Sequence, residues 1–141
     1  MKLTDKVIVV TGGAHGIGAA MLKRFHREQP RALVVADRDA AGAEALAREL
    51  GGAGKALAVA CDVSSEADIV ALVAHATKEY GAIDLFVSNA GIAVGGGVEA
   101  PDEEWRRIID INLMAHVWAA RAVLPAMVAR GSGYLLATQR I

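Results

Sequence analysis

The sequence predicts an α/β fold in which a parallel sheet is doubly wound by helices. Short runs of β-branched and small apolar residues alternate along the chain with segments of helix-forming residues, and a glycine-rich turn follows the first run. Such alternation builds right-handed strand–helix–strand units whose strands pair in parallel. The composition agrees, since 54% of the residues are hydrophobic but only 4% are aromatic, which suits strands buried under helices on both faces.

The length and composition restrict the classes of protein. A chain of 141 residues predicts one domain, residues 1–141, with a hydrophobic core. The formal net charge is −1 and the basic residues are not clustered, so we expect neither a nucleic-acid partner nor a membrane partner. The single cysteine, Cys61, excludes an internal disulfide, and we predict no metal site. We see no signal-peptide pattern and no uninterrupted apolar run of bilayer length, so we expect a cytoplasmic protein.

The first three strands and helices are predicted from apolar runs and the residues that end them. Pro30 stops the first helix, and Gly51 with Gly52 ends the second. The segment from Ser65 to Asp68 matches a capping box that opens the third helix. The predicted strands span residues 7–10, 32–36 and 56–60, and the predicted helices span residues 16–28, 40–50 and 65–80.

The second half continues the same alternation. A fourth strand is predicted over 83–87, before a glycine-rich loop at 92–98. Pro101 and the three acidic residues after it favour a helix start, and this helix would extend to about Ala129, with Pro125 as a point where it could kink. A fifth strand follows over 134–137. The predicted strand order is 3-2-1-4-5, with a ligand crevice above the first turn, where strands 1 and 4 diverge.

The turn after the first strand carries the strongest local signal. It has the pattern Thr-Gly-x-x-x-Gly-x-Gly, formed by Thr11, Gly12, Gly16 and Gly18, with His15 and Ile17 inside it. A turn that leads into a helix N-terminus directs free N–H groups and the positive end of the helix dipole at a ligand, and a diphosphate fits this environment. No Gly-Lys-Ser/Thr follows, which excludes a P-loop. A purely structural glycine turn is the alternative.

This spacing resembles that of the short-chain dehydrogenase/reductase family, which has a Rossmann-like fold. Three further motifs in register add to the resemblance, and they are Asp62-Val63 after the third strand, Asn89-Ala90-Gly91 after the fourth and Asn112-Leu113 in the long helix. The resemblance extends through Thr138. It implies an oxidoreductase that transfers a hydride between NAD(P) and an alcohol or carbonyl substrate.

Asp37 and its neighbours bear on the choice of cofactor. Asp37 ends the second strand, nineteen residues after Gly18, where a carboxylate accepts hydrogen bonds from the adenosine ribose and repels a 2′-phosphate. The alternative is a solvated loop acid, which is our interpretation of Asp39. Arg38 could pair with a 2′-phosphate, and His15 would be mostly neutral at pH 7. We therefore expect NAD rather than NADP.

The resemblance assigns roles to the other motifs. It implies an adenine contact from Asp62 and Val63, next to Cys61, although a strand-end Asp can also simply hold its own loop. It implies that Asn89, Ala90 and Gly91 support the sheet and line the cofactor cleft. It makes Asn112 a catalytic residue that holds a water of the proton relay, whereas an exposed helix position is the alternative. We interpret Asp110 as structural.

The chain departs from the family in its catalytic residues. The family uses a Tyr-x-x-x-Lys pair and a Ser after the fifth strand, but neither tyrosine here has a partner lysine, and Gln139 and Arg140 stand near the position expected for the Ser. Of that catalytic set only Asn112 is present, so we expect no turnover by this chain alone. We favour a fragment or prematurely ended product of a longer enzyme. The alternatives are a non-catalytic NAD-binding module and a remnant that binds nothing.

The long helix is more apolar than one buried face requires. Its apolar residues exceed a single stripe, and they include Ile108, Ile109, Ile111, Leu113, Met114, Val117 and Trp118. Either all of them face the core of this chain, or some contact a second copy. We predict a homo-oligomer formed through the helix at 103–129, and we expect the fifth strand to be a bare apolar edge.

Overall fold

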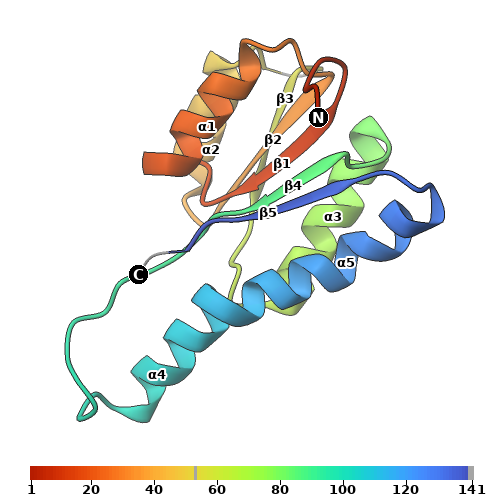
Figure 1. Cartoon of the computed structure of the whole chain (residues 1–141). Coiled ribbons are helices and arrows are strands. Elements are labelled where there is room, and N and C mark those ends of the chain that lie inside the picture. Colours follow the sequence, from red (N-terminus) through yellow and green to blue (C-terminus); the bar gives the residue numbers. More distant parts are fainter. Residues whose placement is uncertain (53, 140–141) are drawn as a thin grey trace.

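A computed structural model describes residues 1–52 and 54–139, which form a five-stranded parallel sheet with helices on both faces (Figure 1). The strand order is β3-β2-β1-β4-β5, which confirms the predicted order. Arg140, one of the two residues expected near the family's Ser position, lies outside the described residues. The strands are β1 (Val7–Thr11), β2 (Ala32–Asp37), β3 (Ala56–Ala60), β4 (Leu85–Ser88) and β5 (Tyr134–Ala137).

The helices divide into two layers, one on each face of the sheet (Figure 1). On one face lie α1 (Gly16–His26) and α2 (Ala40–Glu49), and on the other lie α3 (Glu66–Tyr80) and α5 (Ala115–Ala129), whereas α4 (Asp102–Ile109) extends beyond the sheet (Figure 1) and has no buried residue. Successive residues of β1 supply opposite layers, because Ile8 packs with Leu22 of α1 whereas Val9 packs with Leu72 of α3. This two-sided burial explains why β1 is a continuous apolar run.

Two predicted boundaries differ from the structure by two residues, and for local reasons. The fourth strand begins at Leu85 rather than Ile83, and the Asp84 carboxylate accepts a hydrogen bond from the Val7 N–H at 2.9 Å just before it. The first helix ends at His26 rather than residue 28, because the N–H groups of Glu28 and Gln29 donate to carbonyls only three residues earlier, and Gln29 then adopts a φ of +54°.

Side chains cap two of the helices. Ser65 Oγ accepts the Asp68 N–H at 3.2 Å at the start of α3, as predicted, but the Asp68 carboxylate accepts from the N–H of Asp62 instead of returning to that of Ser65. Asp39, which we expected to be a solvated loop acid, is the N-cap of α2, and its Oδ1 accepts the Gly42 N–H at 3.0 Å.

The long helix is not a single α-helix. Between α4 and α5 the segment Asp110–Met114, labelled η1, winds as a π-helix, whereas Pro125 lies inside α5 without ending it. A π turn adds a residue to the helical repeat, which shifts the faces of the following helix, and such turns occur frequently at functional sites. Here the π segment contains Asn112.

One helical stretch of the described residues, Asp102–Ala129, is long and apolar enough to cross a membrane by length and composition alone. The core helix of a globular domain passes the same test. Ala115, Ala119, Val123 and Met127 of α5 are all buried in the layer that packs on the sheet. One face of this helical stretch therefore packs on the sheet, although only 28% of its apolar window is buried.

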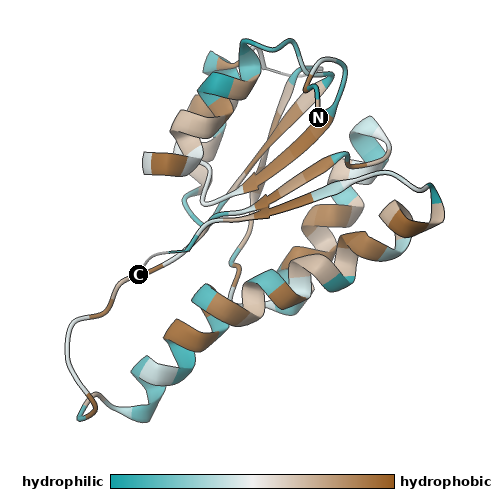
Figure 2. Cartoon of the chain, viewed as in Figure 1, coloured by the Kyte–Doolittle hydropathy of each residue, from teal (hydrophilic) through white to brown (hydrophobic). Residues whose placement is uncertain are grey.

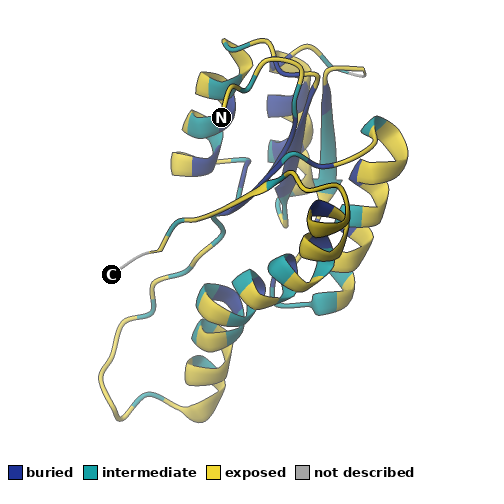
Figure 3. Cartoon of the chain, turned by 45° about the vertical axis from the view of Figure 1, so that its right-hand side comes forward, coloured by how far each residue is buried: buried dark blue, intermediate teal, exposed yellow. Residues whose placement is uncertain are grey.

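Two apolar surfaces remain uncovered (Figures 2 and 3). All four residues of β5 are exposed, as expected for a bare edge strand. On the long helix Ile111 is buried, and Ile108, Met114 and Trp118 are half-buried. The exposed large apolar residues of this helix, which we name the outer stripe, are Trp105, Ile109, Leu113, Val117, Leu124 and Val128.

Candidate functional site

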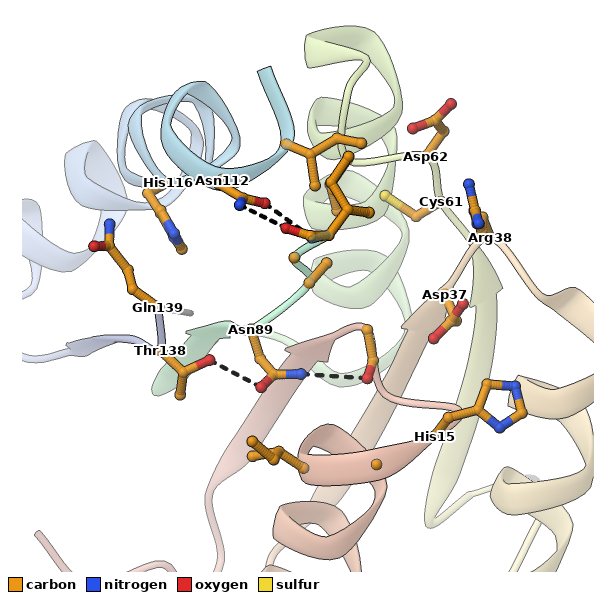
Figure 4. Close-up of a pocket in the computed structure, with 18 residues that line it drawn as sticks. His15, Asp37, Arg38, Cys61, Asp62, Asn89, Asn112, His116, Thr138 and Gln139 are labelled. Carbon is orange, nitrogen blue, oxygen red and sulfur yellow. Dashed lines mark hydrogen bonds between the residues drawn. The ribbon is translucent and has the colours of Figure 1, made fainter. Parts of the chain in front are cut away.

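A cavity of about 430 Å³ lies at the carboxyl ends of the strands (Figure 4). The segments that follow all five strands contribute to its lining, together with the π segment and the start of α5. Every predicted site residue lines this cavity except Thr11 and Gly18. Residues far apart in the sequence are thus gathered at one edge of the sheet, where ligands of open α/β folds bind.

The glycine turn presents an uncompensated helix N-terminus to the cavity. No side chain caps α1, and no acidic residue lies in its first turn. Gly12 has a φ of +62°, and a Cβ there would lie 2.9 Å from the Ala90 Cα, while the space around Gly16 is open to 4 Å. Four N–H groups at a helix start have no partner within the helix. The turn therefore offers donors and a positive dipole end to an anion.

Thr11 and Gly18 lie beneath this turn and hold it in place. Thr11 Oγ1 accepts the N–H groups of Asn89 at 3.0 Å and Ala90 at 3.2 Å, and it donates to the carbonyl of Val87 at 3.4 Å. A Cβ on Gly18 would overlap the Gly12 carbonyl oxygen. Both residues therefore fix the geometry of the cavity floor, although neither lines the cavity itself.

Asp37 has a carboxylate fixed by backbone donors. Its Oδ2 accepts the Ala14 N–H and its Oδ1 accepts the Asp39 N–H, both at 3.0 Å. Beside it, His15 Nε2 lies 2.6 Å from Asp39 Oδ2. The Gly42 N–H, and then the hydrogen bond from His15, lower the pKa of Asp39 below its ordinary value. The Asp37 carboxylate therefore lines this wall of the cavity, next to His15, which contacts Asp39.

Arg38 and Asp62 lie near one another at the same end of the cavity (Figure 4). Asp62 Oδ1 accepts the Ser64 hydroxyl at 2.7 Å and the Ser64 N–H at 2.9 Å. These hydrogen bonds lower the pKa of Asp62, and the charge of Arg38 lowers it further. The Asp62 carboxylate thus stabilises the loop that contains it, which is the alternative role given above for a strand-end Asp. It also lines the cavity.

Cys61 lines the cavity as a buried, unreactive thiol. It is 3% exposed. Burial raises the pKa of Cys61 to about 12, and the carboxylates of Asp68, Asp62 and Asp37 contribute in the same direction. Because the thiolate is the nucleophile of cysteine chemistry, Cys61 does not supply one here.

Asn89 joins the ends of three strands. Its Nδ2 donates to the carbonyls of Thr11 at 3.0 Å and Gly12 at 3.3 Å, and its Oδ1 accepts the Thr138 hydroxyl at 2.9 Å. Thr11 ends β1, Asn89 follows β4 and Thr138 follows β5. One side-chain amide therefore holds the centre of the cavity floor together.

Asn112 connects the π segment to the loop after β4. Its Oδ1 accepts the Ile92 N–H at 2.9 Å, and its Nδ2 donates to the Ile92 carbonyl at 2.8 Å. The two hydrogen bonds imitate a β-bridge between a side chain and the backbone, which explains why an Asn occurs in mid-helix despite its low helix propensity.

The structure adds lining residues that the sequence analysis missed, namely Ile92, Ile111, His116, Thr138 and Gln139. His116 is the chemically notable one, since its Nδ1 lies 2.7 Å from the buried Ser88 hydroxyl. Burial lowers the pKa of His116, and the backbone carbonyl of Asn112 partly opposes this. The available signal was its spacing, since a residue four positions after Asn112 shares its helix face.

Comparisons with known proteins agree with this geometry. In sequence, the chain is 35% identical over 145 residues to tropinone reductase-like 1 of Erythroxylum coca, covering 99% of this chain and 52% of that protein. It is 41% identical over 138 residues to the cis-4-hydroxycyclohexanecarboxylate dehydrogenase of Sinomonas cyclohexanicum, covering 94% of this chain and 53% of that protein.

A solved structure is also similar. The 3-ketoacyl-(acyl-carrier-protein) reductase of Brucella melitensis, complexed with NADH, superposes with a TM-score of 0.87 at 38% identity, covering 96% of this chain and 57% of that one. The chain spans about half the length of the curated relatives it matches. A sequence model of the family described as short chain dehydrogenase matches residues 6–139. The chain therefore belongs to the short-chain dehydrogenase/reductase family of oxidoreductases, which have an NAD(P)-binding Rossmann fold.

Proposed function

We propose that this chain forms the NAD-binding half of an oxidoreductase that transfers a hydride between the nicotinamide and an alcohol or carbonyl group of a small substrate. The observation that carries the proposal is the position of two features on one cavity, the uncapped N-terminus of α1 and the fixed carboxylate of Asp37. An anion and a sugar hydroxyl are the groups that these features would bind.

The lining residues fit a dinucleotide from one end to the other. The N–H groups at the start of α1 would bind the diphosphate, and the open space at Gly16 leaves room for it. Asp37 would accept the hydroxyls of the adenosine ribose. Asp62 and Val63 would contact the adenine, and Ala90 and Gly91 would let the backbone approach the cofactor. When bound, the dinucleotide supplies the carbon that accepts or donates the hydride.

The charges at this end favour NAD over NADP. A 2′-phosphate on the adenosine ribose would meet the Asp37 carboxylate, with that of Asp39 close by through its contact with His15. Arg38 is the cation that could compensate, but it also faces the Asp62 carboxylate, whose pKa it lowers. The carboxylates of Asp37 and Asp39 would repel a 2′-phosphate, and Arg38 is shared with Asp62. These charges therefore favour the binding of NAD over that of NADP.

Calorimetric titration of the purified chain with NAD⁺ and NADP⁺ tests whether the cavity binds the dinucleotide and whether it prefers NAD⁺. We expect NAD⁺ to bind more tightly. Asp37→Ala should weaken NAD⁺ by about tenfold, the value of one hydrogen bond to a charged group, and should narrow its advantage over NADP⁺. Asp102→Ala, which removes an exposed acid of α4 away from the cavity, is the matched control and should change neither affinity. An unchanged affinity ratio in Asp37→Ala would remove Asp37 from the site.

Asn112 is the one member of the family's catalytic set that we assign here. We propose that its hydrogen bonds to Ile92 hold the π segment against the loop after β4, so that the helix lines the substrate end of the cavity and positions a water of the proton relay. The substrate and the remaining catalytic groups belong to the whole enzyme. We also propose a cytoplasmic location, on the basis of the single free thiol of Cys61.

A second candidate is a non-catalytic, self-associating NAD-binding module. The exposed outer stripe of the long helix favours it, because it offers a surface for a second copy. Binding of NAD without turnover, together with a concentration-dependent mass, would favour this candidate.

A further inference from the structure

His116 is a titratable side chain in the cavity to which the proposed function gives no role. It lies in the first turn of α5, four residues after Asn112, and it lines the cavity. Its Nδ1 is 2.7 Å from the hydroxyl of Ser88, which is buried at the end of β4. This contact fixes the ring and occupies one of its two nitrogen atoms.

The position of His116 along the cavity indicates which part of a dinucleotide would lie near it. Asp37, Arg38 and Asp62 are at one end, and Asn112, His116 and Gln139 are at the other (Figure 4). A dinucleotide with its adenosine ribose on Asp37 and its diphosphate on α1 extends from the first end towards the second. Its nicotinamide ring therefore falls at the end that contains His116.

This second end contains few charges. The other side chains that line it are uncharged, namely Ile92, Ile111, Asn112, Thr138 and Gln139. Among the charged groups on the elements that pack together here, Glu66 of α3 pairs with Arg121 of α5 at 2.6 Å, and Asp110 is half-buried in the π segment. None of these charges, nor any other among the described residues, contributes to the pKa shift of His116, whose causes are burial and the Asn112 carbonyl. A proton on His116 is thus the main change of charge available there.

We propose that the protonation state of His116 sets the preference of this cavity between the oxidised and the reduced dinucleotide. The nicotinamide ring is cationic in NAD⁺ and neutral in NADH. A protonated imidazole close to it in a partly buried, poorly screened site repels the oxidised ring alone. This inference rests on the proposed function, since it requires that the cavity binds the dinucleotide.

The effect has a defined direction with pH. Burial holds the pKa of His116 below its ordinary value, so the ring is neutral at and above neutral pH, and the preference is constant there. As the pH falls through this pKa, the affinity for NAD⁺ should drop while that for NADH does not. Because coupling between two binding events is reciprocal, bound NAD⁺ should lower the pKa of His116, and bound NADH should leave it unchanged.

The test measures the affinities of NAD⁺ and NADH by calorimetry between about pH 5 and 8, the range in which histidine titrates. The ratio of the NAD⁺ and NADH dissociation constants should rise by about tenfold towards low pH, which corresponds to a coupling of one pKa unit. In His116→Gln the ratio should stay flat. His75→Gln, which replaces an exposed histidine of α3, should behave like the unmodified chain.

A second measurement keeps the test decisive if His116→Gln folds poorly. The NMR titration of the His116 ring in the unmodified chain, repeated with each dinucleotide, should give a lower pKa with NAD⁺ than with NADH. If neither dinucleotide binds at any pH, the proposed function is wrong. Three other outcomes overturn only the inference about His116. Both dinucleotides bind but the ratio of their dissociation constants does not change with pH, or that ratio still depends on pH in His116→Gln. The third is that the pKa of His116 is the same with NAD⁺ and with NADH bound.

Discussion

At the scale of single residues, the Thr11 hydroxyl supports the floor of the cavity more than any other side chain of β1. It accepts two backbone N–H groups from the loop after β4 and donates to the carbonyl of Val87. Thr11→Val keeps the shape of the side chain but leaves these N–H groups without an acceptor. Since each unsatisfied buried group costs about 1–3 kcal/mol, we expect urea denaturation to show a loss of about 2 kcal/mol.

Thr11→Ser is the matched control, because it keeps the hydroxyl and removes one methyl group. It should retain most of the stability of the unmodified chain. Equal losses in Thr11→Val and Thr11→Ser would mean that packing, and not hydrogen bonding, is the main contribution of Thr11.

Gly18 allows a close approach between α1 and the preceding turn. In Gly18→Ala the new methyl group would overlap the Gly12 carbonyl oxygen, and Asn89 Nδ2 would lie 2.7 Å from it. Backbone cannot move aside cheaply, so we expect a destabilisation of about 1–3 kcal/mol, as for other overpacked sites. Thermal unfolding followed by circular dichroism would measure it.

Gly95→Ala is the control for Gly18→Ala. Its Cβ would meet nothing within 4 Å, and Gly95 does not have a positive φ. The change should leave the melting temperature the same or raise it slightly. A melting temperature of Gly18→Ala equal to that of Gly95→Ala would contradict the close approach.

At the scale of elements, the outer stripe of the long helix predicts self-association. Leu113 and Val117 lie one turn apart near its middle and are 52% and 40% exposed. We expect a concentration-dependent mass in analytical ultracentrifugation. The double change Leu113→Glu with Val117→Glu should shift the equilibrium towards monomer, because charged residues are depleted from the cores of interfaces.

Val70→Glu is the matched control for this pair of changes. Val70 is 52% exposed on α3, outside the long helix, so its replacement should leave the association unchanged. A clean monomer of the unmodified chain over the whole concentration series would remove the prediction.

The elements also show how far sequence reasoning extends. The buried strands and their order were predictable, because a run such as 7–10 with a glycine turn after it has few alternative structures. The π segment was not, because the apolar residues of the long helix exceed a single stripe, and they hide the shift of phase that the extra residue introduces. The cap by Asp39 had a local signal, because an Asp directly before the predicted helix at 40–50 is a preferred N-cap, and its partner Gly42 is three residues away. His116 was missed for another reason, since its contact with Ser88 joins residues 28 apart in the sequence.

At the scale of the whole molecule, both tyrosines lie away from the cavity. Tyr134 begins β5, at the amino end of the sheet, and Tyr80 ends α3 beside the same end. Because neither tyrosine lines the cavity, neither supplies a proton-transferring phenol to the site. We predict that the chain binds NAD⁺ but does not reduce it when a panel of alcohols is added, as measured by the absorbance of reduced nicotinamide. Turnover in proportion to protein concentration would contradict this.

Because burial makes the Cys61 thiol unreactive, its reactivity reports on local opening of the structure. It is the one cysteine in the sequence, it lies at the carboxyl end of β3, and its thiol has a pKa raised to about 12. A reagent can therefore alkylate Cys61 only when the segment after β3 opens or the chain unfolds. The rate of labelling measures how often that opening occurs. A ligand that fills the space beside it would slow the labelling, so mass spectrometry of a single thiol could register occupancy without any assay of chemistry.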